Sequence, residues 1–99
     1  MPPKPENVQV MRRNETAVEV TWSHINFEIS GYRVYYSMEP SRDLQHWKYK
    51  DVGSYTSLVM KVLPKKAYAF RVAAKSVDNR FGPPSQIVLT NEIGPGKMI

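Results

Sequence analysis

The stretch from Tyr68 to Ala74 constrains the fold more than any other part of the chain. Its side chains divide into two alternating sets, Tyr68, Phe70, Val72 and Ala74 in one and Ala69, Arg71 and Ala73 in the other. A period of two is that of a β-strand, whose side chains point alternately to the two faces of a sheet. The stretch therefore predicts a half-buried strand and not a helix.

Tyr68 stands at the start of this strand, a few residues after Val62-Leu63-Pro64. A Tyr in that place can pack its ring into the core and turn its hydroxyl back to the preceding backbone, an arrangement called a tyrosine corner. We therefore expect Tyr68 to stabilise the fold through its hydroxyl as well as its ring.

Six further segments have the pattern of strands: residues 7–12, 17–23, 31–37, 47–52, 57–62 and 86–90. The side chains expected to face the core in them are Val8, Val10, Val18, Val20, Trp22, Tyr32, Val34, Tyr36, Val59, Val62, Ile87 and Leu89. Those expected to face outward include Glu19, Thr21, Arg33 and Tyr35. Seven short strands separated by turns predict an all-β sandwich of two sheets.

Length and composition agree with one small domain. A chain of 99 residues with 41% hydrophobic residues can bury a core of its own. There is no cysteine, which excludes disulfides, thiol catalysis and thiolate metal sites. No apolar run approaches the roughly 20 residues needed to cross a bilayer, so we expect no direct membrane insertion. Proline and glycine near the ends predict linkers at residues 1–4 and 92–99, around a domain at residues 5–91.

Four segments together resemble the fibronectin type III family: Pro5–Val8, Val18–Trp22, Ile29–Tyr36 and Gly82–Ser85. The resemblance covers nearly the whole chain. It implies a seven-stranded, immunoglobulin-like β-sandwich of two antiparallel sheets. The core implied for that sandwich contains Trp22, Tyr32, Val34, Tyr68, Phe70 and Val72.

The chain departs from the family pattern in two turns. Leu63-Pro64-Lys65-Lys66 lacks the glycine that often follows the proline, and residues 76–82 contain no Arg-Gly-Asp, so integrin binding through that tripeptide is not implied. There is also no Trp-Ser-x-Trp-Ser signature of membrane-proximal cytokine-receptor modules. Residues 35–40, followed by Trp47, resemble modules of receptor-type tyrosine phosphatases and neural adhesion receptors.

The residue types needed for catalysis do not occur in any useful pattern. His24 and His46 are the only histidines, and neither has a metal-ligand spacing such as His-Glu-x-x-His. A general base also needs a partner and a pocket, which a sandwich filled with side chains seldom offers. The sequence therefore predicts no enzyme, no cofactor and no metal site.

Asn14-Glu15-Thr16 is an N-glycosylation acceptor sequence in the expected turn between the first two strands, where a glycan would reach solvent. The tripeptide is short enough to arise by chance. Given an extracellular location, Asn14 is a candidate glycosylation site.

The formal net charge of +5 suggests a basic face. Arg33, Arg71 and Lys75 should project outward from neighbouring strands, with Tyr35 among them, and Lys48 and Lys50 could extend the patch. Such a face attracts polyanions, and a heparan-sulfate-like glycosaminoglycan is the natural extracellular candidate. The simpler interpretation is a solvated face whose cations keep a sheet soluble and discourage edge pairing. If Tyr35 and these cations lie beside Phe81, they form a candidate site for a protein partner.

The preferred interpretation is an extracellular, non-catalytic module of a multidomain receptor or adhesion protein, which sets domain spacing and contacts a protein partner. A structural repeat of an intracellular, muscle-type protein is the alternative, and a glycosaminoglycan-binding matrix module is the third. No recognised nucleic-acid module is present, so we expect no nucleic-acid partner. The isolated domain is expected to be monomeric.

Overall fold

A computed structural model describes residues 1–90 of the chain. Within these residues there are seven strands and one short 3-10 turn. In chain order they are β1 (Gln9–Asn14), β2 (Ala17–Thr21), β3 (Ile29–Ser37), η1 (Leu44–His46), β4 (Lys48–Gly53), β5 (Ser57–Lys61), β6 (Ala69–Ser76) and β7 (Val88–Leu89). Each strand lies within two residues of its predicted bounds. In this described part of the chain the sole helical element, η1, has three residues, so the predicted all-β fold class is confirmed.

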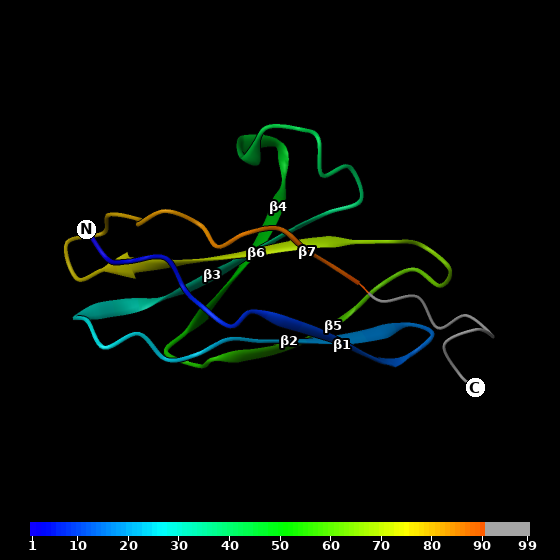
Figure 1. The fold of residues 1–99 in the computed structure, drawn as a ribbon, viewed down its shortest axis with the longest axis horizontal. Helices are drawn as coiled ribbons and strands as arrows, with labels where there is room; N and C mark the ends of the chain where they lie inside the picture. Colours follow the sequence, from blue (N-terminus) through cyan, green and yellow to red (C-terminus); the bar gives the residue numbers. More distant parts are fainter. Residues whose placement is uncertain (91–99) are drawn as a thin grey trace.

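The strands form two antiparallel sheets packed face to face (Figure 1). One sheet has the order β1-β2-β5 and the other the order β4-β3-β6-β7. The predicted seven-stranded sandwich of two antiparallel sheets is therefore confirmed. The segment between β3 and β4, which includes η1, projects from the body at the top of the view (Figure 1).

The core lies between the two sheets. Its buried cluster contains all six side chains expected from the family pattern: Trp22, Tyr32, Val34, Tyr68, Phe70 and Val72. Val18, Val20, Val10 and Ala74 belong to the same cluster. The edge of the Trp22 ring meets Tyr32 at a centroid distance of 5.5 Å. Alternating side chains from β2, β3 and β6 thus fill the space between the sheets, as the period of two predicts.

Three of the predicted inward residues, Val59, Ile87 and Leu89, are exposed, so their predicted orientation is wrong, whereas Val62 is buried as predicted. In β5, Val59 is 58% exposed, whereas Met60 is buried and Leu58 packs against the core. Near β7, Ile87 is 44% and Leu89 55% exposed. In that segment Val88 packs against the core instead, and Thr90 is buried. In both segments apolar residues occupy both faces, so hydrophobicity alone does not tell which set faces inward.

The side chain of Ser85 replaces part of the ladder between β6 and the segment that leads to β7. Its Oγ accepts a hydrogen bond from the Val72 amide at 2.9 Å, and its own amide donates to the Val72 carbonyl at 2.7 Å. Regular pairing is confined to two registers, Ala69 with Leu89 and Phe70 with Val88. The side chain and backbone of Ser85 therefore hold the segment before β7 against β6.

Tyr68 makes the expected tyrosine corner. Its hydroxyl accepts a hydrogen bond from the backbone amide of Leu63 at 2.9 Å, and its ring stacks near Phe70. Between these residues the turn places Lys65 at φ 61°, the left-handed conformation that glycine adopts most easily. The missing glycine noted in the sequence therefore leaves a lysine in a backbone conformation that costs about 1 kcal/mol or more.

The first residues lie against the sandwich. The Pro2 side chain is among the fully buried ones, and a Cβ added to Gly82 would stand 2.1 Å from the Pro2 carbonyl oxygen. Any side chain at position 82 would push this segment away. Gly82 therefore allows the amino-terminal segment to pack on the loop that follows β6.

Candidate functional site

The outward side of the β4-β3-β6-β7 sheet brings together aromatic and charged side chains. Cross-strand partners share a face, and the register pairs Tyr35 with Tyr49 and Arg71, and Arg33 with Asp51. An isolated bridge places Phe81 opposite Lys75 on the same side. We call this surface the outer face, defined by Arg33, Tyr35, Tyr49, Asp51, Arg71, Lys75 and Phe81.

Arg33 is the centre of the outer face. Its guanidinium carbon lies 3.7 Å from the centre of the Tyr49 ring and 4.3 Å from that of Phe81. Two hydrogen bonds join it to Asp51, from Nε to Oδ1 at 2.7 Å and from a terminal nitrogen to Oδ2 at 3.1 Å. A planar guanidinium suits both kinds of contact, since it stacks on rings and matches the two oxygens of a carboxylate. Arg33 therefore fixes the positions of two aromatic rings.

The ion pair between Arg33 and Asp51 also shifts the pKa of both residues. The hydrogen bond from Arg33 lowers the pKa of Asp51 below its ordinary value, against the opposing effect of burial. The hydrogen bond to Asp51 in turn raises the pKa of Arg33. Both groups are therefore charged at neutral pH, and the charge of Arg33 is matched by a neighbouring carboxylate.

Replacing Asp51 with Asn is expected to lower the free energy of unfolding at pH 7 by less than about 1 kcal/mol, because the Asp51 side chain is 53% exposed. Since the pKa of Asp51 is lowered in the folded state, the ion pair stabilises above the ordinary aspartate pKa of 3.8. That contribution is lost as the pH falls through the lowered value. Urea denaturation of both proteins at pH 7 and pH 2 measures it, and a difference that stays constant to pH 2 contradicts the assignment.

Two of the cations expected to form the basic face already donate hydrogen bonds to acceptors within the domain. Arg33 is paired with Asp51, and the Nε of Arg71 donates to the Ser85 carbonyl at 2.8 Å. Lys75 lies with its Nζ 5.7 Å from the centre of the Phe81 ring. These cations do share one side of the sheet, but a carboxylate matches the charge of Arg33.

Lys48 and Lys50 do not extend the outer face, so that expectation is wrong. The register pairs Lys48 with Tyr36 and Lys50 with Val34, whose side chains belong to the opposite side of β3. Both lysines line hollows at the open side of the sandwich, between β4 and β5. They are exposed because β4 is a sheet edge, so their side chains extend past the core into solvent.

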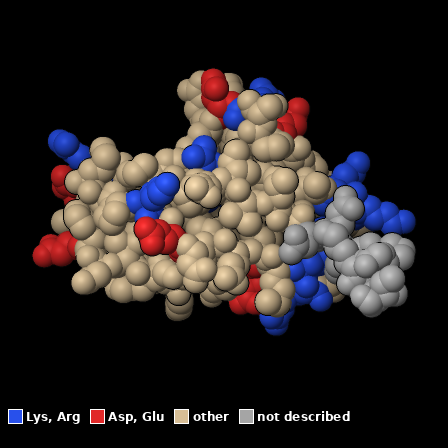
Figure 2. All heavy atoms as spheres, in the orientation of Figure 1, with Lys and Arg blue, Asp and Glu red and all other residues tan. Residues whose placement is uncertain are grey.

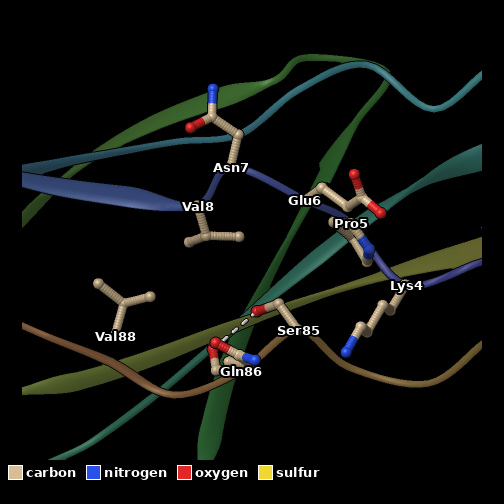
Figure 3. A pocket seen from close by; sticks show the side chains of 8 residues that line it. All are labelled: Lys4, Pro5, Glu6, Asn7, Val8, Ser85, Gln86 and Val88. Carbon is tan, nitrogen blue, oxygen red and sulfur yellow. Dashed lines mark hydrogen bonds between the residues drawn. The ribbon is translucent and has the colours of Figure 1, made fainter.

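Other charges and hollows are more scattered. Figure 2 shows Lys and Arg gathered toward the end of the molecule that carries the β1–β2 and β5–β6 turns. Fewer charged side chains lie in the middle of the face that the figure shows. A hollow of about 390 Å³ separates the amino-terminal segment from the segment before β7, with Val8 and Val88 toward each other (Figure 3). Lys4 and Glu6 are the two charged residues that line it, so it has no preferred sign.

The remaining candidates lie outside the outer face. Asn14 is exposed at the end of β1, where its Oδ1 accepts a hydrogen bond from the Thr16 amide at 2.9 Å. His24 and His46 are exposed. Within residues 1–90 there is no group of three or more His, Asp or Glu side chains placed to hold a metal ion. In the same residues no helix is long and apolar enough to span a membrane.

Sequence reasoning missed Tyr49, Asp51 and Lys61. Tyr49 and Asp51 alternate with Lys48 and Lys50, which was a signal that the tyrosine and the carboxylate share a face. Which face they share depends on the β3–β4 register, which no local pattern gives. Lys61 ends β5 and lines the same hollows as Lys48 and Lys50, a proximity that exists only in the folded chain.

Comparison with known proteins gives a consistent result. The family model described as fibronectin type III domain matches residues 3–91. Receptor-type tyrosine-protein phosphatase S from Gallus gallus is 35% identical over an alignment of 74 residues, which covers 71% of this chain and 5% of that protein. The chain thus spans about a twentieth of the length of this relative.

Solved structures share the fold. The crystal structure of the chicken CNTN1 FN1-FN3 domains has a TM-score of 0.77 and 22% identity, and covers 89% of this chain and 32% of that one. The fn3 domain of human contactin 1 gives 0.75 and 23%, over 92% and 80% of the two chains. The FN5 domain of Drosophila Lar gives 0.71 and 23%, over 90% and 94%.

Proposed function

The chain belongs to the fibronectin type III domain family, and we propose that it acts as a non-catalytic module of a multidomain cell-surface receptor or adhesion protein. In this role it spaces neighbouring domains and contacts a protein partner. The similarity to a receptor-type protein supports this class of parent protein. In that relative the matched residues form a small part of a much longer chain, which supports the role of a module.

The outer face is the observation that carries the contact role. It offers Tyr35, Tyr49 and Phe81 around an arginine that is already held in place. Tyrosine and arginine are enriched at protein interfaces, and a side chain fixed before binding loses less entropy when a partner arrives. The contacts of Arg33 with Tyr49, Phe81 and Asp51, which we call the Arg33 clamp, therefore favour a preformed contact surface.

An extracellular location is part of the proposal. The similarity to a receptor-type protein favours it, and the exposed Asn14 supplies a glycan acceptor on the turn after β1. The β1–β2 turn belongs to the sheet that does not carry the outer face, so a glycan there would leave the contact surface free.

The other two candidate roles are weaker. An intracellular structural repeat is disfavoured by the receptor-type relative. A glycosaminoglycan-binding role for the outer face is disfavoured because its most central cation is matched by Asp51. Direct electrostatic attraction of a polyanion requires unmatched positive charge.

A binding screen tests the proposed function. The domain, secreted as a dimeric fusion, is applied to cells that each display one receptor ectodomain, with and without enzymatic removal of heparan sulfate. Saturable binding that survives removal is expected. Binding that disappears with heparan sulfate indicates a polysaccharide ligand instead, and absence of binding to every ectodomain leaves only the spacing role.

A further inference from the structure

A second surface lies on the open side of the sandwich, where β4 and β5 are the outermost strands of their sheets. Two hollows of about 830 and 440 Å³ adjoin there and share Tyr36, Lys61 and Tyr68 in their lining. We call them together the side groove. It involves neither Arg33 nor the aromatic rings that stack on it, so it is separate from the outer face.

Positive charge dominates the rim of the side groove. Lys48 lines the larger hollow, Lys50 the smaller, and Lys61 both. Within residues 1–90 none of these three lysines takes part in an ion pair. Arg42 and His46 line the larger hollow from the projecting segment, and the carboxylate there, Glu39, is 3.5 Å from Arg42. The rim therefore favours an anionic ligand.

Apolar and aromatic side chains form part of the walls of the side groove. They include Tyr36, Met38, Leu58, Val62, Leu63 and Tyr68. Apolar walls between cations favour a ligand that carries both carboxylates and apolar groups, since a purely ionic ligand would leave this surface in contact with water or poorly matched polar groups.

The strands that bound the groove have backbone groups to offer. β4 pairs with β3 alone and β5 with β2 alone, so each has one edge without a partner strand in the described part of the chain. Such an edge pairs with another polypeptide backbone by strand addition, which a sugar chain cannot do. Lys48 and Lys50 are two residues apart and therefore project on the same side of β4.

We propose that the side groove binds an extended acidic polypeptide segment of a partner protein, which pairs with the edge of β4. Every second side chain of that segment points into the groove, where its carboxylates meet Lys48, Lys50 and Lys61 and its apolar groups contact the walls. The surface differs from the outer face, so this site and the proposed function can fail separately.

The test is an NMR titration of the ¹⁵N-labelled domain with a capped octapeptide in which every second residue is Glu or Val, on one face of the extended chain, and the other residues are Thr. We expect shifts at β4, β5 and the residues around Tyr36, and weaker binding of the peptide in which Gln replaces Glu. The triple variant Lys48→Gln, Lys50→Gln and Lys61→Gln should bind about tenfold more weakly, as three exposed charge pairs predict. A peptide N-methylated at alternate residues should also bind more weakly, because it cannot donate to the strand edge.

The matched control is Lys4→Gln, Arg13→Gln and Arg80→Gln, which removes the same charge elsewhere and should leave the affinity within about twofold. Well-dispersed spectra and similar thermal midpoints establish that both triple variants are folded. Equal weakening in both reduces the effect to net charge and overturns the proposal. So does full-strength binding of the N-methylated peptide, absence of binding by the parent peptide, or shifts of these amides by a heparin oligosaccharide alone.

Discussion

Replacing Trp22 with Ala is expected to lower the free energy of unfolding by about 3–5 kcal/mol, a large part of a small domain's stability. Trp22 is 5% exposed, belongs to the central cluster and meets Tyr32 edge to face. Its removal leaves a cavity between the two sheets that a rigid sandwich cannot close. Guanidinium denaturation, analysed for midpoint and m-value, measures the loss.

Trp22→Phe is the matched control. Within the described residues the Trp22 indole N–H is buried without a hydrogen-bond partner, so the phenyl ring loses volume but also removes an unsatisfied donor. The Phe variant should therefore lose less than half of what the Ala variant loses. A loss below about 1 kcal/mol for Trp22→Ala would show that this side chain does not hold the sheets together.

Replacing Tyr68 with Phe is expected to cost about 1–3 kcal/mol, although the ring and its packing remain. The lost hydroxyl accepts a hydrogen bond from the Leu63 amide at 2.9 Å, and the change leaves that donor without its partner. The corner joins the turn after β5 to the start of β6, so its loss also loosens the connection between the sheets. Urea denaturation midpoints at constant m-value measure the cost.

Tyr55→Phe supplies the control for the hydroxyl. Tyr55 is 75% exposed, so its loss of a hydroxyl should change the free energy of unfolding by less than about 0.5 kcal/mol. Equal stability of the parent and Tyr68→Phe proteins would mean that the hydrogen bond of the corner contributes nothing net.

The inward-facing residues of the central strands could be predicted because large apolar side chains occur mainly on one face of each strand. In β2, β3 and β6 large apolar side chains alternate with polar or small ones, so the period of two fixes the inward set. β6 is more buried than the predicted half-buried strand, because Ala69 and Ala73 on its other side are also buried. Small side chains between larger neighbours are covered by them, which alternation does not express.

The edge strands could not be predicted as well, for a physical reason. Leu58, Val59 and Met60 are consecutive apolar residues, and β4 consists of exposed residues except for Val52, so neither strand marks its inner face. The Arg33 clamp depends on the β3–β4 register and on the loop that returns Phe81 to β6. Contacts of this kind arise from tertiary structure, and no local pattern specifies them.

A glycan placed on one sheet at a time tests the central claim, that the outer face is the contact surface, most directly. Tyr35→Asn turns residues 35–37 into an acceptor sequence on β3, and Glu19→Asn turns residues 19–21 into one on β2. Each change is a single substitution on a central strand, and each glycan covers the outward side of one sheet. The mass before and after glycosidase digestion reports occupancy of each acceptor, Asn14 included.

Binding of the three secreted proteins to the ectodomain identified in the screen is then compared. The account predicts that the glycan at position 35 abolishes binding, while the glycan at position 19 leaves it within about twofold of the parent. Undiminished binding of the Tyr35→Asn protein with its glycan in place would contradict the claim that the partner contacts the outer face.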